Sequence, residues 1–170
     1  LGINSGTSMD SIDVGLFDLS SAFQQVYATQ FPIDAKLKQQ TWQVIANNQI
    51  AGDNVKQIDT AFAHAFANAA LQLLKQQNLT AKDIIAIGSH GQNISHQPNI
   101  TPPHSIQIGS PQLIADITQI PTVGHFRQAD IEAGGQGAPL SPLLHQKLFL
   151  KPGCPRAVIN IGGITNVSII

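Results

Sequence analysis

The residues best suited to chemistry begin in the polar loop Ser5-Gly6-Thr7-Ser8, which Asp10 follows. Gly6 lets the backbone come close to a ligand, and the backbone amides with the hydroxyls of Thr7 and Ser8 supply several donors to phosphate oxygens. Asp10 adds a carboxylate suited to a hydrated Mg²⁺ or a polarised water. The loop therefore predicts a site for an anion, and the donors favour phosphate.

A second polar cluster, Gly88-Ser-His-Gly-Gln92, directly follows the short apolar run Ile84–Ile87. Folds that combine strands and helices place ligands at the carboxyl ends of their strands, so polar side chains at this position face a crevice. His90 and Gln92 could bond a hydroxyl-rich substrate there. A turn whose polar groups bond only one another explains the same residues equally well.

A third cluster gathers Arg127, Asp130 and Glu132 within six residues of a chain in which only 11% of residues are charged. The run Gly134-Gly-Gln-Gly137 that follows lacks the G-x-G-x-x-G spacing of a dinucleotide site. We interpret it as a loop lining a cleft before a helix that starts near Pro139. An ordinary turn between helices is the alternative.

The histidines do not predict a metal site. His90, His96 and His104 match no usual zinc-ligand spacing, and the segment that holds the last two is rich in proline. His64 and His145 each lie alone on an expected helix, where a structural role is much more common.

These clusters need elements to position them, and the alternation and spacing of apolar residues predict an α/β fold. Residues 1–3 and 12–17 form a hairpin around the anion loop, and residues 22–31 add a third strand. A helix over residues 33–47 has Asp34 as its cap, and a longer helix begins at an Asp53 or Asn54 cap. Thr80–Asp83 is a capping turn, and prolines make residues 93–105 a loop. Further elements are a strand over 105–109, a helix from Ser110-Pro111 and a short strand over 121–127.

The end of the chain repeats the pattern of its beginning. Residues 156–170 predict a second hairpin, with Gly162, Gly163, Thr165 and Asn166 at its tip. Two such hairpins about 150 residues apart are typical of a duplicated fold that clamps a nucleotide. Both ends of the sequence fall within strands, so we expect a piece of a longer protein.

Composition excludes several classes. With 170 residues, 42% of them hydrophobic, and a net charge of -1, the chain is globular rather than disordered and is no binder of nucleic acid. The single Cys154 excludes a disulfide framework and fits a reducing cytoplasm. No apolar run is long enough to span a membrane, and no signal peptide is visible.

In combination, the motifs resemble the bacterial anhydro-N-acetylmuramic acid kinases, in register over the whole chain. The matching segments are Asn4-Ser-Gly-Thr-Ser-Met-Asp-Ser-Ile-Asp13, Ile87-Gly-Ser-His-Gly-Gln92, Ile106-Gln-Ile-Gly109, Phe126-Arg127 with Asp130, Gly134-Gly-Gln-Gly-Ala-Pro-Leu140, and Asn160-Ile-Gly-Gly163 with Asn166.

The resemblance implies an actin-like ATPase (ribonuclease H-like) fold, with residues 1–150 as the first lobe and 151–170 as a linker and the first hairpin of the second. It also implies a cytoplasmic kinase that uses ATP, Mg²⁺ and water to open 1,6-anhydro-N-acetylmuramic acid and phosphorylate O6 in cell-wall recycling. Its partners would be the amino sugar and ATP, with a homodimer left open. The implied nucleotide site comprises Gly6, Thr7, Ser8, Met9, Asp10, Ser11, Ile12, Asp13, Gly162, Gly163 and Asn166, with Asp10 as a metal ligand. The implied sugar site comprises His90, Gly91, Gln92, Arg127 and Asp130.

The catalytic aspartate of the family and its adenine pocket are expected beyond Ile170. Two residues depart from the family pattern, which usually has Gly at Ser11 and Asp at His125. The first restricts the loop backbone, and the second replaces a fixed negative charge with a titratable ring.

Other classes remain open. An actin-like or Hsp70-like ATPase would turn over nucleotide without sugar, and a metal-dependent hydrolase would act without ATP. A domain that only binds is the third alternative.

Overall fold

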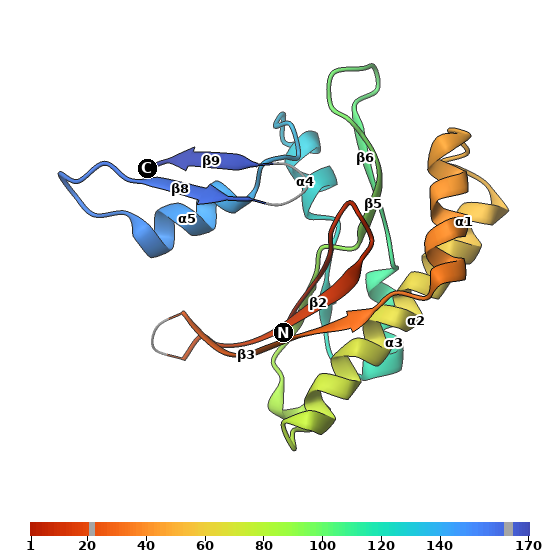
Figure 1. Ribbon diagram of the computed structural model, residues 1–170, viewed down its shortest axis with the longest axis horizontal. Helices are drawn as coiled ribbons and strands as arrows, with labels where there is room; N and C mark the ends of the chain where they lie inside the picture. Colours follow the sequence, from red (N-terminus) through yellow and green to blue (C-terminus); the bar gives the residue numbers. More distant parts are fainter. Residues whose placement is uncertain (21–22, 162–164) are drawn as a thin grey trace.

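A computed structural model describes residues 1–20, 23–161 and 165–170. Its centre is a mixed sheet that begins with the predicted hairpin (Figure 1). Strand β1 (Gly2–Ser5) pairs antiparallel with β2 (Ser11–Asp18), and β2 pairs antiparallel with β3 (Gln24–Pro32). The other edge of β1 is parallel to β4 (Ile87–Ser89), which is parallel to β7 (Thr122–Val123). The strand order is therefore β3-β2-β1-β4-β7.

Helices pack against one face of this sheet. Helix α1 (Ala35–Ala46) begins as predicted, because the Asp34 carboxylate accepts a hydrogen bond from the amide of Leu37 at 2.9 Å. Helix α2 (Asp53–Gln76) starts after Gly52, which has a φ of 96°. The predicted cap at Asp53 or Asn54 was wrong, since the chain turns into the helix at a glycine that allows the left-handed backbone. Helix α3 (Pro111–Thr118) has the predicted Ser110 cap, and the capping turn at Thr80 forms the 3₁₀ helix Ala81–Asp83.

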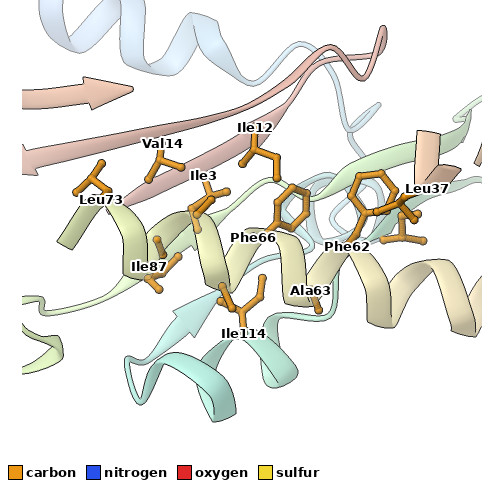
Figure 2. Close-up of a cluster of buried hydrophobic side chains, with 14 of the residues drawn as sticks. Ile3, Ile12, Val14, Leu37, Phe62, Ala63, Phe66, Leu73, Ile87 and Ile114 are labelled. Atoms are coloured by element: carbon orange, nitrogen blue, oxygen red, sulfur yellow. The ribbon is translucent and has the colours of Figure 1, made fainter. Parts of the chain in front are cut away.

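The core lies between the sheet and α2 (Figure 2). Phe62 and Phe66 of α2 are fully buried, with Phe66 beside Ile3 and Ile12 of the first hairpin and Phe62 beside Leu37 of α1. Burying each such side chain contributes about 1.5–3 kcal/mol. The helix thereby holds the hairpin that carries the anion loop.

A second hairpin stands beside the sheet, at a place where a loop was predicted. Strands β5 (Gln92–Gln97) and β6 (His104–Ile108) pair antiparallel. The loop prediction for residues 93–105 was wrong because the prolines lie in the turn between the strands. The predicted strand over 105–109 is confirmed as β6.

The remaining elements are α4 (Phe126–Glu132), α5 (Ser141–Phe149), β8 (Ala157–Asn160) and β9 (Asn166–Ile169). Strands β8 and β9 form the hairpin predicted at the end of the chain. The strand expected over 121–127 is only two residues long, because the chain enters α4 at Phe126. Among the described residues, none from 138 to 170 is buried, so the core ends before α5. No helix in the described ranges is long and apolar enough to cross a membrane.

Candidate active site

A row of polar side chains crosses the sheet on the face away from α2, at the carboxyl end of β1. Asn4 is paired with Asp13 and Asp13 with Gln30 in register. On the other edge, Ile3 is paired with Ser89, so His90 continues the row, and its amide donates to the carbonyl of Ile3 at 2.9 Å. Residues of three strands and of the turn after β4 therefore meet at one edge.

A row of small residues lies on the same face, two positions before Asn4 along β1. Gly2 is paired with both Gly15 and Gly88, and Gly15 is paired with Ala28. A cavity of about 550 Å³ lies over this floor and reaches the polar row, with Phe17 and Phe126 among its lining residues. The volume falls within the range typical of small-molecule sites. The sheet thus offers an apolar floor with a polar end.

His90 and Arg127 meet at this polar end. The Nε of Arg127 donates to Nε2 of His90 at 3.1 Å, and Nδ1 of His90 lies 3.1 Å from the carbonyl of Gly91. One tautomer satisfies both contacts, with the proton on Nδ1 and a lone pair on Nε2. Burial lowers the pKa of His90, and the charge of Arg127 lowers it further, against the opposing bond to Gly91. The ring is therefore neutral when it accepts from Arg127.

The β5–β6 hairpin fixes the backbone beside His90. The side-chain amide of Gln107 donates to the carbonyl of His90. Gly91 has a φ of +73°, and a Cβ there would lie 2.8 Å from the carbonyl oxygen of Ile108. The turn therefore needs glycine at this position. The Oε1 of Gln107 is buried and has no partner among the described atoms.

Gln92 lies beneath the site rather than at its surface. Its side chain is 1% exposed, and its Oε1 accepts from the hydroxyl of Ser5 at 2.7 Å. Its Nε2 donates to the carbonyl of Asn93 at 3.1 Å. Both ends of the amide are thus bonded within the protein, and they tie the start of the anion loop to β5.

The anion loop is an exposed turn held by a buried residue. The amide of Met9 donates to the carbonyl of Gly6 at 3.0 Å, and the side chain of Met9 is fully buried. Gly6, Thr7 and Ser8 are exposed at the tip. Ile12 is also buried, so the side chains of Met9 and Ile12 anchor the loop from below, and their predicted place in the nucleotide site stays a prediction.

Asp10 carries an ion pair that the sequence did not indicate. The ammonium group of Lys38 on α1 donates to Oδ1 of Asp10 at 2.7 Å. Hydrogen bonds from Lys38 and Ser8 hold the pKa of Asp10 below its ordinary value. Asp13 instead accepts from Ser11 at 3.3 Å and from Gln30 at 2.8 Å. Among the described residues no group of three or more acidic, histidine or cysteine side chains could hold a metal ion.

Asp130 shapes the glycine loop that follows α4. Its Oδ2 accepts from the amide of Gly137 at 2.7 Å, and its backbone carbonyl accepts from Gly135 at 2.8 Å. A Cβ on Gly135 would lie within 2.7 Å of both carboxylate oxygens. The predicted role of Asp130 in binding a substrate stays a prediction, since this carboxylate is occupied by the loop.

The tip of the last hairpin is described only in part. Asn166 begins β9, pairs with Asn160 and is exposed. The predicted nucleotide residues Gly162 and Gly163 lie outside the described residues.

Sequence comparison assigns the family. A family model described as anhydro-N-acetylmuramic acid kinase matches residues 1–170. The chain belongs to this family. The resemblance inferred from the motifs is thereby confirmed, and the family implies a kinase that acts on a sugar and uses ATP.

For an anhydro-N-acetylmuramic acid kinase family member, the structure adds residues that were not among the predicted site residues. Asn4 and Gln30 belong to the polar row, Phe126 lines the cavity, and Lys38 neutralises Asp10. Asn4 opens a family motif, and its place in that motif was the available signal. The sequence gives no sign of Lys38, because that contact joins residues 28 positions apart.

Proposed function

We propose that this protein uses ATP and water to convert 1,6-anhydro-N-acetylmuramic acid into N-acetylmuramic acid 6-phosphate in peptidoglycan recycling. The observation that carries the proposal is the position of one cavity. It extends from Asp13, near the start of β2 and just after the anion loop, to His90, whose ring accepts a hydrogen bond from Arg127. A phosphate-type loop and a polar sugar-binding end therefore lie on one sheet edge, in a chain of a sugar kinase family.

The strand order supports an actin-like ATPase (ribonuclease H-like) fold. Three antiparallel strands are followed by two parallel ones, in the order β3-β2-β1-β4-β7. We assign residues 1–150 to the first lobe of such a fold and residues 151–170 to a linker and the start of the second. The exposure of the β8–β9 hairpin is consistent with this division.

In the proposed reaction, water adds to C1 of the sugar, the bond from C1 to O6 breaks, and O6 takes the γ-phosphoryl group of ATP. The proton of the water passes to a general base, and ADP leaves. Thr7, Ser8 and the loop amides donate hydrogen bonds to phosphate oxygens, where negative charge must be stabilised. His90 and Arg127 hold the sugar at the polar end of the cavity.

The donor set of the loop fits an ATP-bound Mg²⁺. Magnesium in such sites takes one or two carboxylates and fills its remaining positions with phosphate oxygens and water. Asp10 offers one exposed carboxylate, and its lowered pKa keeps it ionised. Asp10 would hold Mg²⁺, which neutralises phosphate charge when bound. Lys38 could then turn from Asp10 to a phosphate oxygen.

The small-molecule partners in this proposal are the amino sugar and ATP, with no nucleic acid, and a homodimer remains a prediction. ATP as phosphoryl donor favours the cytoplasm as the location.

A direct test measures ADP formation by the full-length protein with Mg-ATP, with and without the anhydro sugar. Sugar-dependent ADP formation and a phosphorylated sugar support the proposal. ADP formation that is the same without sugar would favour a conformational ATPase instead.

A further inference from the structure

We propose that Lys38 is a phosphate-binding residue of the nucleotide site, and that Asp10 holds its ammonium group beside the anion loop until phosphate and Mg²⁺ arrive. This inference rests on the proposed function, because it adds a residue and a charge exchange to the proposed ATP site. Lys38 belongs to none of the motifs that carry the family resemblance.

The first argument is the position of Lys38, which the register of the sheet determines. Ser11, the first residue of β2 after the anion loop, is paired with Pro32, the last residue of β3. The chain therefore leaves the sheet beside the loop and enters α1 at the Asp34 cap. Leu37 is buried, and the amide of Lys38 donates to the carbonyl of Asp34 at 2.9 Å. The first turn of α1 is thus fixed next to the anion loop.

The second argument is the way the lysine side chain reaches the loop. The side chain of Lys38 is 33% exposed, whereas that of Asp10 is 72% exposed, and the lysine Nζ donates to Oδ1 of Asp10 at 2.7 Å. The aliphatic part of the lysine therefore packs on the protein, while its ammonium group extends to the exposed loop.

The third argument is the charge of the loop. Residues 5–9 are uncharged, and Asp10 and Asp13 each add a negative charge. ATP carries several negative charges, which these two carboxylates repel. Among the described residues, the cation that pairs with this loop is Lys38. A phosphate site here therefore needs the charge of Lys38.

The fourth argument is that the ion pair can be exchanged. A solvent-exposed pair of a carboxylate and an ammonium group contributes little to stability, so little is lost when it breaks. The ammonium group has three donors on a flexible stem, so rotation of the side chain turns it from a carboxylate to a phosphate oxygen. When Asp10 turns to Mg²⁺, Lys38 is free to donate to phosphate. Without Mg²⁺, Asp10 competes with phosphate for the same ammonium group.

The exchange predicts opposite effects of Asp10 and Lys38 on the binding of metal-free ATP. Calorimetry measures the Kd of ATP for the full-length protein in EDTA, for the wild type, Asp10→Asn, Lys38→Gln and the double variant. We expect Asp10→Asn to lower this Kd, because the substitution releases the ammonium group and removes a negative charge. In the Asp10→Asn background, Lys38→Gln should raise the Kd about 10- to 100-fold, because a charge-assisted hydrogen bond to phosphate is lost.

The same titration with Mg²⁺ tests the complete site. Lys38→Gln alone should then raise the Kd of ATP about 10- to 100-fold. The matched control is Lys36→Gln, because Lys36 is exposed on the same turn of α1 and forms no ion pair among the described residues. It removes the same charge, and its Kd should stay within about twofold of the wild type, since salt screens a charge that does not touch the ligand.

Three results would overturn the inference. If Lys38→Gln has no effect in the Asp10→Asn background, Lys38 only neutralises Asp10. If Lys36→Gln raises the Kd as much as Lys38→Gln does, the effect is one of net charge rather than of contact. If Asp10→Asn leaves the Kd of metal-free ATP unchanged or raises it, the carboxylate does not compete with phosphate.

Binding is measured without sugar, so the outcome is independent of the kinase reaction. Binding of ATP that depends on Lys38, in a protein that phosphorylates no sugar, would refute the kinase function and uphold the phosphate site. Phosphorylation of the sugar with an ATP affinity that does not depend on Lys38 would uphold the kinase function and refute the inference. No binding of ATP by the wild type would refute both.

Discussion

The substitution Gly6→Ala tests whether the anion loop binds phosphate, because it should weaken ligand binding without disturbing the fold. Gly6 is exposed, and a Cβ there would meet only the hydroxyl of Ser8, at 4.0 Å. Its backbone does not need the left-handed conformation, and the bond from Met9 to its carbonyl does not involve a side chain. Alanine therefore fits the free protein without strain.

The two expected effects have opposite signs. A compatible Gly→Ala change restricts the unfolded chain and raises the free energy of unfolding by about 0.4–1 kcal/mol. The added methyl group keeps phosphate oxygens from the loop amides, and each lost charge-assisted hydrogen bond costs about 1.5–3 kcal/mol. The loss of one such bond raises the KM for ATP about 10- to 100-fold.

The assay compares steady-state KM values for ATP and for the sugar with the midpoint of denaturant unfolding. The KM for the sugar is the internal control, because the polar end of the cavity lies elsewhere on the sheet edge. A more stable protein with an unchanged KM for ATP would refute the assignment of this loop to phosphate.

Three further predictions concern the supports of the site. Phe66→Ala should lower the free energy of unfolding by about 3–5 kcal/mol in denaturant titration, because the ring is fully buried; a loss below about 1 kcal/mol would contradict this packing. Gly91→Ala should cost about 2–4 kcal/mol and lower kcat/KM for the sugar, because the residue has a positive φ and no room beside Ile108; an unchanged Tm would contradict it. His90 has a lowered pKa in the fold, so its contribution to stability is complete above about pH 6.5 and is lost as the pH falls through the lowered pKa. The substitution His90→Gln should make the free energy of unfolding less dependent on pH in that range. A pH dependence unchanged from the wild type would show that His90 does not titrate there.

The first hairpin was predictable because its signals are local. Apolar residues on both sides of a glycine-containing polar loop specify two strands and a turn, and β1 and β2 pair as expected. The caps at Asp34 and Ser110 were equally local and are confirmed.

The errors arose where one signal had two structural explanations. Pro98, Pro102 and Pro103 indicated a loop, yet they occupy the turn that joins β5 to β6. Helix α4 gave no start signal, because His125 stands at its cap with a φ of 57° and no side-chain bond. Local propensity could not specify either segment.

The candidate site depends on pairings that no local pattern contains. Asn4, Asp13 and Gln30 meet because of the register of three strands, and His90 joins them from at least 60 positions away. The motifs indicated that His90 and Arg127 matter but not that they contact each other. The burial of Gln92 could also not be predicted from the sequence, since a polar residue after a strand can contact a ligand or form hydrogen bonds that support the site from below.

In the proposed reaction, one protein both opens the anhydro bridge with water and phosphorylates O6. The full-length protein is incubated with Mg-ATP and 1,6-anhydro-N-acetylmuramic acid in ¹⁸O-labelled water, and the sugar product is weighed by mass spectrometry. We expect a phosphorylated sugar that carries one ¹⁸O. Loss of ATP with an unchanged sugar would contradict it.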